Sequence, residues 1–395
     1  MTSAAVAAAL VLGACTAQKE DKTVAPWGET ACDEALSEDF DLDNIVAAGE
    51  LIALTLSGPE SYYDYRGRKL GVQYLLCQKL ADRLGVSLRM EVCRDTSEML
   101  SRLAAGDADL IAYCLSRKAL AAGKDSLGQM IFMGDSVGGR PLGWVVGEGK
   151  DDLAAELRSW YGAKVLDGVR REEAFLLSSR SVRRHVYSPM LNRSGGVISR
   201  YDGLFMTYCR PIRWDWRLMA AQCYQESTFD PRARSWAGAC GLMQIMPSTA
   251  ERLGLPQSKI YDPESNIAAA ARYIGQLEGK FTDIKDRSER TNFVLACYNG
   301  GYHHIRDAMA LAARDGRNPH RWDEVSRYVL LLSEPRYYRD PIVKYGYMRG
   351  SETVGYVDNI RRRWQSYRGV GGPKGGHGGF MEPRKALREK KKYKI

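Results

Sequence analysis

Short apolar runs alternate with amphipathic stretches in the first half of the chain. Apolar residues that are continuous over five to seven positions predict strands, and apolar residues that recur every three or four positions predict helices. On this basis we expect, in chain order, strand 51–55, helix 71–85, strand 88–92, helix 96–106, strand 109–115, strand 142–149 and helix 151–162. Strands that alternate with helices are typical of a parallel α/β sheet.

The pattern changes after about residue 206, where only helical periodicity remains. Asp262 before Pro263 is typical of a helix start, Gly279 of a helix end, and Ser351 is the expected N-cap of the last helix. The fold class is therefore multi-domain, an α/β domain followed by a mostly α-helical domain. The expected parts are an apolar N-terminal segment, a tether, an α/β lobe, a linker, a helical domain and a disordered basic tail, at 1–15, 16–43, 44–165, 166–205, 206–368 and 369–395.

The first 15 residues are an apolar run of small side chains that ends in Leu-Gly-Ala-Cys. A polar stretch follows at residues 16–23. The run is too short to cross a bilayer as a helix. The amino-acid sequence of this segment resembles a lipoprotein signal peptide, in which Cys15 would carry the lipid. An ordinary secretory signal with a chance cysteine is the alternative. Acylation at Cys15 would hold the protein stably on a membrane surface.

The formal charge of +9 changes this picture little. Residues 383–395 carry seven Lys and Arg against one Glu, so the folded body is close to neutral and no nucleic-acid partner is expected. No Cys-x-x-Cys pair occurs, and His303 and His304 have no clustered ligands around them, so we expect no metal site and no cofactor, and we place both histidines on the surface.

The helix from Trp214 places one carboxyl group on its inward face. The stripe Trp216, Met219, Ala220 and Cys223 continues onto Glu226. Pro231 disfavours helical geometry at Asp230, so Glu226 lies in the last turn, where unpaired carbonyls disfavour an anion. Burial and the helix end should both raise the pKa of Glu226. A carboxylic acid that is neutral near pH 7 can protonate a glycosidic oxygen.

The residues that follow Glu226 resemble the signature of the lytic transglycosylases in the lysozyme-like superfamily. The run is YQESTFDPRARSWAGACGLMQIMPSTAERLGL, and ACYNGG at 296–301 is similar to a second motif of that family. KYGYMRGSETVGYVDNIRRRW, at 344–364, is similar to the C-terminal motif of its membrane-bound F type. The resemblance implies that Glu226 is the catalytic acid/base. It also implies a substrate groove with Ser227, Gly241, Met243, Gln244, Tyr298, Asn299 and Tyr356.

The first half resembles one lobe of the periplasmic amino-acid-binding proteins, over residues 48–118, and such a module precedes the catalytic domain in F-type enzymes. Only a short segment separates strand 109–115 from strand 142–149, so the second lobe is expected to be largely missing. A cleft that closes between two lobes cannot form from one, which argues against ligand capture by hinge closure.

The resemblance implies a lytic transglycosylase that cleaves the bond between N-acetylmuramic acid and N-acetylglucosamine and leaves 1,6-anhydro ends. Glycosidases that use water normally need a second carboxylate, and none is evident, because Asp230 and Glu352 are better explained as helix-end residues. A lysozyme-type hydrolase and a non-catalytic wall-binding lipoprotein are the alternatives.

The expected partners are peptidoglycan glycan strands, a membrane reached through the lipid anchor, and possible other cell-wall enzymes. The expected location is the cell envelope. The inner and outer membranes both fit the sequence, and of the two we expect the periplasmic face of the outer membrane.

Overall fold

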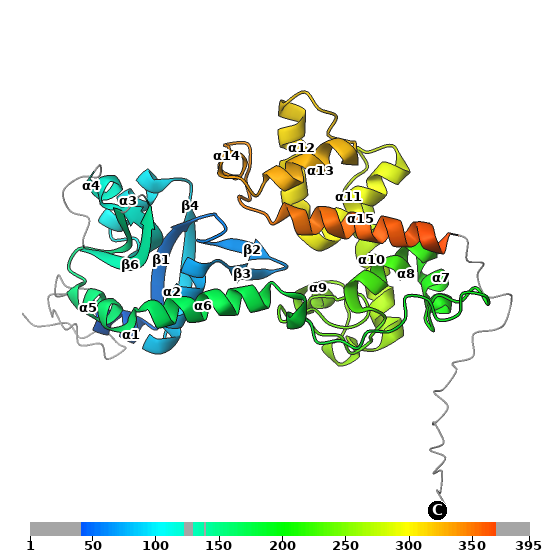
Figure 1. The fold of residues 1–395 in the computed structure, drawn as a ribbon, viewed down its shortest axis with the longest axis horizontal. Helices are drawn as coiled ribbons and strands as arrows, with labels where there is room; N and C mark the ends of the chain where they lie inside the picture. The colour runs from blue at the N-terminus through cyan, green and yellow to red at the C-terminus, as the bar shows by residue number, and fades with distance from the viewer. Residues whose placement is uncertain (1–40, 122–128, 138–139, 369–395) are drawn as a thin grey trace, which may run out of the picture. The chain divides into compact units, whose positions relative to one another are not determined.

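A computed structural model describes residues 41–121, 129–137 and 140–368 of the chain. The expected lipidation site Cys15, most of the expected tether and the basic tail lie outside these residues. The described part contains an α/β lobe followed by a helical domain, which confirms the predicted fold class (Figure 1).

The lobe is built on a five-stranded sheet in the order β4-β1-β5-β7-β6. Its strands are β1 Glu50–Leu56, β4 Ser87–Cys93, β5 Leu110–Ser116, β6 Gln129–Val137 and β7 Arg140–Val146. β1 runs parallel to β4 and β5, whereas β7 is antiparallel to both β5 and β6. The prediction of a parallel sheet was therefore wrong for its second half. The described chain between β5 and β7 has no long crossover helix, and antiparallel strands are the ones that short connections can join.

Helices cover both faces of this sheet (Figure 1). One face packs on α1 Leu42–Ala48, α2 Val72–Leu84, α5 Asp151–Trp160 and α6 Ala163–Leu176, and the other on α3 Thr96–Ala104 and α4 Arg117–Ala121. β1 shows why both faces are covered, since Leu51 and Ala53 are buried on the first side and Leu54 and Leu56 on the second.

The lobe ends later than the sequence predicts. The expected boundary at residue 165 falls inside α6, whose Leu166 and Val169 are buried in the same core as α2. The Arg and Ser content of this segment suggested a linker, but its apolar positions recur at helical spacing and cover α2. The first part of the predicted linker is thus a helix of the lobe.

A small hairpin, which the sequence did not predict, projects from the lobe. β2 Tyr63–Tyr65 and β3 Arg68–Leu70 pair in antiparallel fashion around the two residues Arg66 and Gly67. Both turn residues have positive φ, 51° and 74°. This is the backbone twist that suits a two-residue hairpin, and Gly67 adopts it without steric cost.

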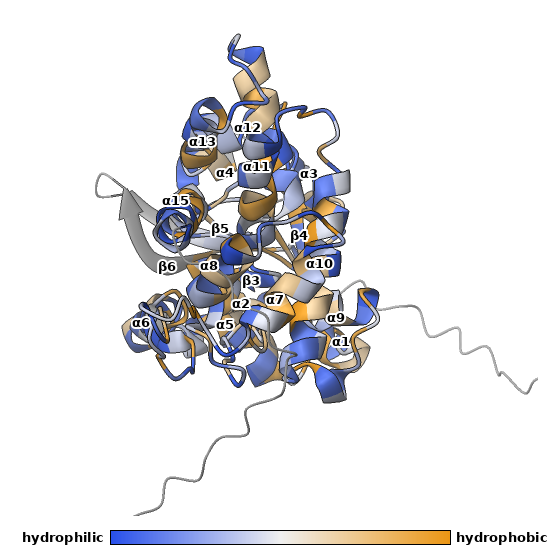
Figure 2. Cartoon of the chain, turned by 90° about the vertical axis from the view of Figure 1, so that its right-hand side faces the viewer, coloured by the Kyte–Doolittle hydropathy of each residue, from blue (hydrophilic) through white to orange (hydrophobic). Residues whose placement is uncertain are grey.

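The helical domain has one continuous core. Its helices are α7 Asp202–Cys209, α8 Trp216–Ser227, α9 Pro247–Arg252, α10 Pro263–Gly279, α11 Arg287–Gly300, α12 Tyr302–Arg314, α13 Trp322–Leu331, α14 Pro335–Tyr338 and α15 Gly350–Tyr367. α15 packs against α8, α11 and α13, and its colouring in Figure 2 is largely hydrophilic. This helix begins before the predicted cap Ser351, because Arg349 is its N-cap and Gly350 already lies inside it. No helix within the described ranges is long and apolar enough to span a bilayer.

An irregular loop at 233–245 lies between α8 and α9, and Asn266 of α10 holds it in place. The fully buried Asn266 amide donates to the carbonyls of Cys240 at 3.1 Å and Ile260 at 2.7 Å, and it accepts from the Met243 N–H at 2.8 Å. Gly241 packs so closely here that a Cβ would lie 2.5 Å from Asn266 Nδ2. Any side chain at Gly241 would therefore displace the asparagine.

We predict that Asn266→Ala lowers the free energy of unfolding by about 3 kcal/mol, because three buried backbone groups lose their partner. Urea unfolding followed by circular dichroism measures this change. The matched control is Asn318→Ala, since Asn318 is exposed and accepts one bond from His320 N, and it should cost less than about 0.5 kcal/mol. Equal losses in the two variants would show that Asn266 does not organise the loop.

Candidate active site

α8 ends abruptly just after Glu226. Asp215 caps its start by accepting from the Arg217 N–H at 2.9 Å. At its other end Thr228 and Phe229 both have positive φ, 53° and 62°. Residues other than glycine seldom adopt this conformation, and strain of this kind gathers at functional sites. The Thr228 hydroxyl donates to the carbonyl of His185 at 2.8 Å, which helps to hold the strained turn.

The Glu226 carboxyl is almost wholly buried, with 9% of the residue exposed. Its Oε1 accepts a hydrogen bond of 2.5 Å from the Tyr356 hydroxyl on α15. The Gln222 amide donates in turn to that hydroxyl at 3.2 Å. Burial raises the pKa of Tyr356 well above its ordinary value, and the neighbouring Glu226 adds to this effect. The phenol therefore keeps its proton and acts as the donor.

Burial also raises the pKa of Glu226, to about 6, as the sequence predicted. Arg66, the hydrogen bond from Tyr356, and Arg184 oppose this rise because each favours the carboxylate. Arg184 also donates from Nη1 to the backbone carbonyl of Glu226 at 3.0 Å, close to the end of α8. The carboxyl is thus balanced between a neutral and an ionised form.

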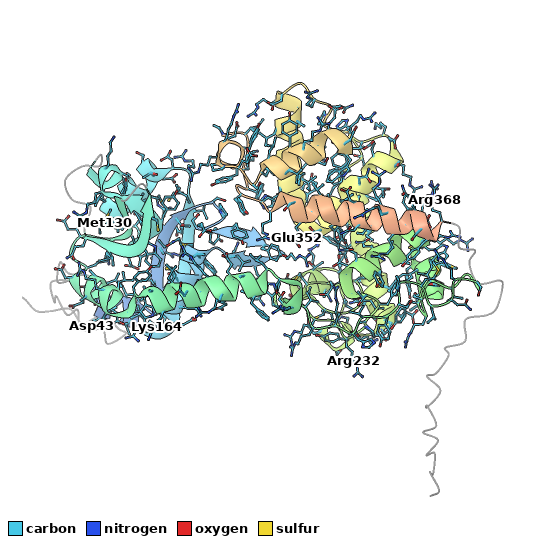
Figure 3. The ribbon with its side chains drawn as sticks, in the orientation of Figure 1. Asp43, Met130, Lys164, Arg232, Glu352 and Arg368 are labelled. Atoms are coloured by element: carbon cyan, nitrogen blue, oxygen red, sulfur yellow. The ribbon has the colours of Figure 1, made fainter. Side chains whose placement is uncertain are left out.

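A second carboxylate, Glu352, lies in the first turn of α15, where Figure 3 labels it. It pairs with Arg66 Nη2 at 2.5 Å and accepts from the Tyr65 hydroxyl at 2.9 Å. Its negative charge raises the pKa of Glu226. The expectation that Glu352 is only a helix-end residue was therefore incomplete.

Two of the expected groove residues are buried behind the acid instead. Ser227 is fully buried, and its hydroxyl donates to the Cys223 carbonyl at 3.1 Å within α8. The Met243 side chain is fully buried in the core. Ser227 is buried because the inward stripe of α8 continues past Glu226 and takes Ser227 with it. Contact of these side chains with a substrate stays a prediction.

Gly241 and Gln244 make contacts inside the loop. Gly241 is needed for the close approach of Asn266, which differs from the expected close approach of a sugar. The Gln244 amide donates to the carbonyls of Ala233 at 3.1 Å and Gly241 at 2.9 Å. Both residues shape the loop from within.

Tyr298 and Asn299 stand at the end of α11 and are partly exposed. The Tyr298 hydroxyl donates to the Met243 carbonyl at 2.8 Å, and its pKa is raised by burial and by Glu226. Asn299 Oδ1 accepts from the Thr353 hydroxyl at 2.7 Å. Tyr298 therefore lies beside the acid, and Asn299 ties α11 to α15.

His304 is not the surface residue that the sequence suggested. Its Nδ1 is buried and has no hydrogen-bond partner within the described ranges, and burial lowers its pKa to about 4, so the ring is neutral. His303 is exposed and stacks on Tyr345 with ring centroids 4.2 Å apart. In the part of the chain that the structure describes, no three His, Cys, Asp or Glu side chains are grouped to hold a metal.

Four residues around Glu226 were not identified from the sequence. Gln222 lies one helical turn before the acid, so its position could have been found from spacing alone. Arg66, Arg184 and the role of Glu352 could not, because each is more than 40 positions away in the chain and only the tertiary fold brings it close.

Comparisons with known proteins show which proteins the chain resembles. Residues 210–320 match the transglycosylase SLT domain. Membrane-bound lytic murein transglycosylase F of Citrobacter koseri is 29% identical over 420 residues, which cover 81% of this chain and 80% of that protein. Its counterpart from Aeromonas hydrophila subsp. hydrophila is 34% identical over 218 residues, 55% of this chain and 43% of that protein.

The chain therefore spans less than half of the Aeromonas protein and four-fifths of the Citrobacter protein. The 70 kDa soluble lytic transglycosylase from Escherichia coli is 26% identical with a TM-score of 0.32, over 42% of this chain and 24% of that one. The sequence comparisons confirm the resemblance that the motifs after Glu226 predicted: the chain is similar to the membrane-bound lytic murein transglycosylases F, and its residues 210–320 match the transglycosylase SLT domain.

Proposed function

We propose that this protein is a peptidoglycan lytic transglycosylase with Glu226 as its single acid/base. The observation that carries the proposal is the buried Glu226 carboxyl, whose pKa is raised to about 6 and which accepts a hydrogen bond from Tyr356. The SLT domain and the relatives named for murein cleavage support the substrate class.

In the first step the protonated Glu226 donates its proton to the glycosidic oxygen between N-acetylmuramic acid and N-acetylglucosamine. A raised pKa keeps a larger fraction of the carboxyl protonated near neutral pH than an ordinary glutamate would show. The substrate's own 2-acetamido group can assist at the anomeric carbon in place of a protein nucleophile.

In the second step the ionised Glu226 takes a proton from the C6 hydroxyl of the same muramic acid, which closes a 1,6-anhydro ring. The hydrogen bond from Tyr356 and the charges of Arg66 and Arg184 favour the carboxylate that this step needs. A tethered hydroxyl gains a large effective concentration over water, equivalent to roughly 7 to 11 kcal/mol of barrier.

Glu352 is the obvious candidate for a base that would activate water instead. Its carboxylate is already occupied by Arg66 and Tyr65. This pairing favours transglycosylation over lysozyme-type hydrolysis.

The envelope location belongs to the same proposal. Acylation at Cys15, which lies outside the described residues, would anchor the enzyme at the periplasmic face of the outer membrane, within reach of glycan strands and other cell-wall enzymes. Within the described ranges the α/β lobe is not accompanied by a second lobe. Because a cleft that closes on a ligand needs two lobes, we do not propose capture of a free amino acid as its role.

We predict that Glu226→Gln abolishes glycan cleavage, to below about one per cent of wild-type turnover, because the amide cannot carry a proton through the cycle. Release of soluble muropeptides from purified peptidoglycan measures the turnover. The control is Glu264→Gln, an exposed glutamate on α10 that should leave activity near wild type. Turnover above a few per cent in the Glu226 variant, with an unchanged circular dichroism spectrum, would remove Glu226 from the catalytic role.

Products formed in ¹⁸O-labelled water distinguish the two reaction types. We expect anhydro-muropeptides without label at the cleaved end, each lighter by one water than the hydrolysed product, since the attacking oxygen comes from the substrate. Mass spectrometry of the digest detects both the ¹⁸O label and the mass difference of one water. Reducing ends that carry the label would instead support a hydrolase.

A further inference from the structure

We propose that Arg66, at the tip of the β2–β3 hairpin of the α/β lobe, is a positioning residue for the acid/base in the helical domain. It pairs with Glu352, which lies one helical turn before Tyr356 on α15, and Tyr356 bonds Glu226, so the charge of Arg66 is held at the helix that contacts the acid. The inference rests on the proposed role of Glu226. It gives the lobe a direct part in the chemistry.

Arg66 is held between the hairpin and α15. Its Nη2 pairs with Glu352 Oε1 at 2.5 Å, and the side chains of the two residues are only 31% and 29% exposed. Tyr65 donates to the same oxygen at 2.9 Å. The Nε of Arg66 is buried and has no partner among the residues described. The ion pair with Glu352 therefore does not satisfy the whole guanidinium, because one buried N–H remains unpaired.

The hairpin tip is fixed to the helical domain by further contacts. The Tyr65 ring stacks on Trp236, with centroids 6.1 Å apart and planes 3° apart. Arg68 Nε donates to the Ala237 carbonyl at 2.9 Å. These contacts lie on both sides of the turn residue Arg66, so its side chain is directed by a supported backbone rather than by a free loop.

The groups that face Glu226 come from several elements. Arg66 and Arg184 are cations among them, Glu352 is an anion, and Tyr356 donates a hydrogen bond. Tyr298 of α11 and Cys223 of α8 also interact with Glu226, and burial raises the pKa of both, so they stay neutral. Arg66 opposes the effect of burial most strongly. Although burial disfavours the charge on Arg66, the carboxylate of Glu352 and the smaller effect of Glu226 raise its pKa. It therefore remains charged at every pH at which the enzyme is folded and active.

This arrangement has a chemical consequence. A group that first gives and then takes a proton needs a pKa that is high, yet not so high that the ionised form becomes inaccessible. Burial alone would keep the carboxyl neutral. Arg66 limits that effect, so it stabilises the carboxylate that proton donation leaves behind.

The pH dependence of kcat/KM tests the inference. Activity that needs protonated Glu226 is present below its pKa and is lost as the pH rises through it. Arg66→Met removes a charge that lowers this pKa. The alkaline limb of the pH profile, where kcat/KM falls as the pH rises, should therefore move upward by roughly one pH unit. Arg66→Lys keeps the charge and should leave the limb near its wild-type position. Lys69→Met removes another hairpin cation, one whose ion-pair partner is Asp64 of the hairpin itself rather than a residue of the helical domain, and it should not move the limb.

Glu352→Gln is an independent test, in which the alkaline limb should shift in the opposite direction. Loss of a negative charge near Glu226 lowers its pKa, so the alkaline limb should move downward. In the double variant Arg66→Met/Glu352→Gln the two effects oppose each other, and the upward shift should be smaller than in Arg66→Met. The double variant also removes the uncompensated anion, which keeps the test valid if Arg66→Met alone folds poorly.

Initial rates are measured with solubilised glycan strands at limiting concentration, at pH values from well below to well above the pKa of Glu226. These rates define the alkaline limb of each variant, and circular dichroism checks the fold. Folded Arg66→Met with an unmoved limb would overturn the inference, as would equal shifts in the Met and Lys variants, which would indicate a structural role. An inactive wild type, or an active Glu226→Gln, would instead overturn the proposed function itself.

Discussion

The hydrogen bond between Tyr356 and Glu226 is the interaction on which the site depends. It joins α15 to α8 across 130 positions of the chain, and it forms only when the last helix is packed against the helix that carries the acid. A second link, from the Trp364 indole to Asp215 at 2.8 Å, connects the two helices near the start of α8. With both ends of α8 held, the carboxyl is buried in a fixed orientation, which is what proton transfer to a defined oxygen requires.

Burial of that carboxyl would be costly without compensation, and the surrounding residues provide it. The acid accepts a hydrogen bond from Tyr356, while the nearby Arg66 pairs with Glu352 and Arg184 bonds the Glu226 backbone carbonyl. The loop held by Asn266 forms the neighbouring wall through internal hydrogen bonds. The small and polar residues of that loop take part in its own packing, and the pKa of Glu226 is set by burial and by the charges around it.

The sequence predicted what depends on local order and missed what depends on tertiary contact. Helical spacing placed Glu226 on the inward face of α8, and the same spacing shows why Ser227 is buried. The close contact of the Asn266 side chain with Gly241 depends on the tertiary fold and was not foreseen, while the approach of a sugar at Gly241 stays a prediction. The antiparallel strands β6 and β7 and the contact of Arg66 with Glu352 follow from chain connections and packing that no short motif records.

The central claim is that burial, opposed by nearby cations, keeps the Glu226 carboxyl in a range where it can both give and accept a proton. A ¹³C NMR titration of protein labelled at the glutamate carboxyl carbons, with the Glu226→Gln variant used to assign the signal, measures this directly. The account predicts a midpoint near 6, well above the ordinary value of 4.5. A midpoint at the ordinary value would contradict it, because the carboxyl would then be ionised throughout the neutral range and unable to start the reaction.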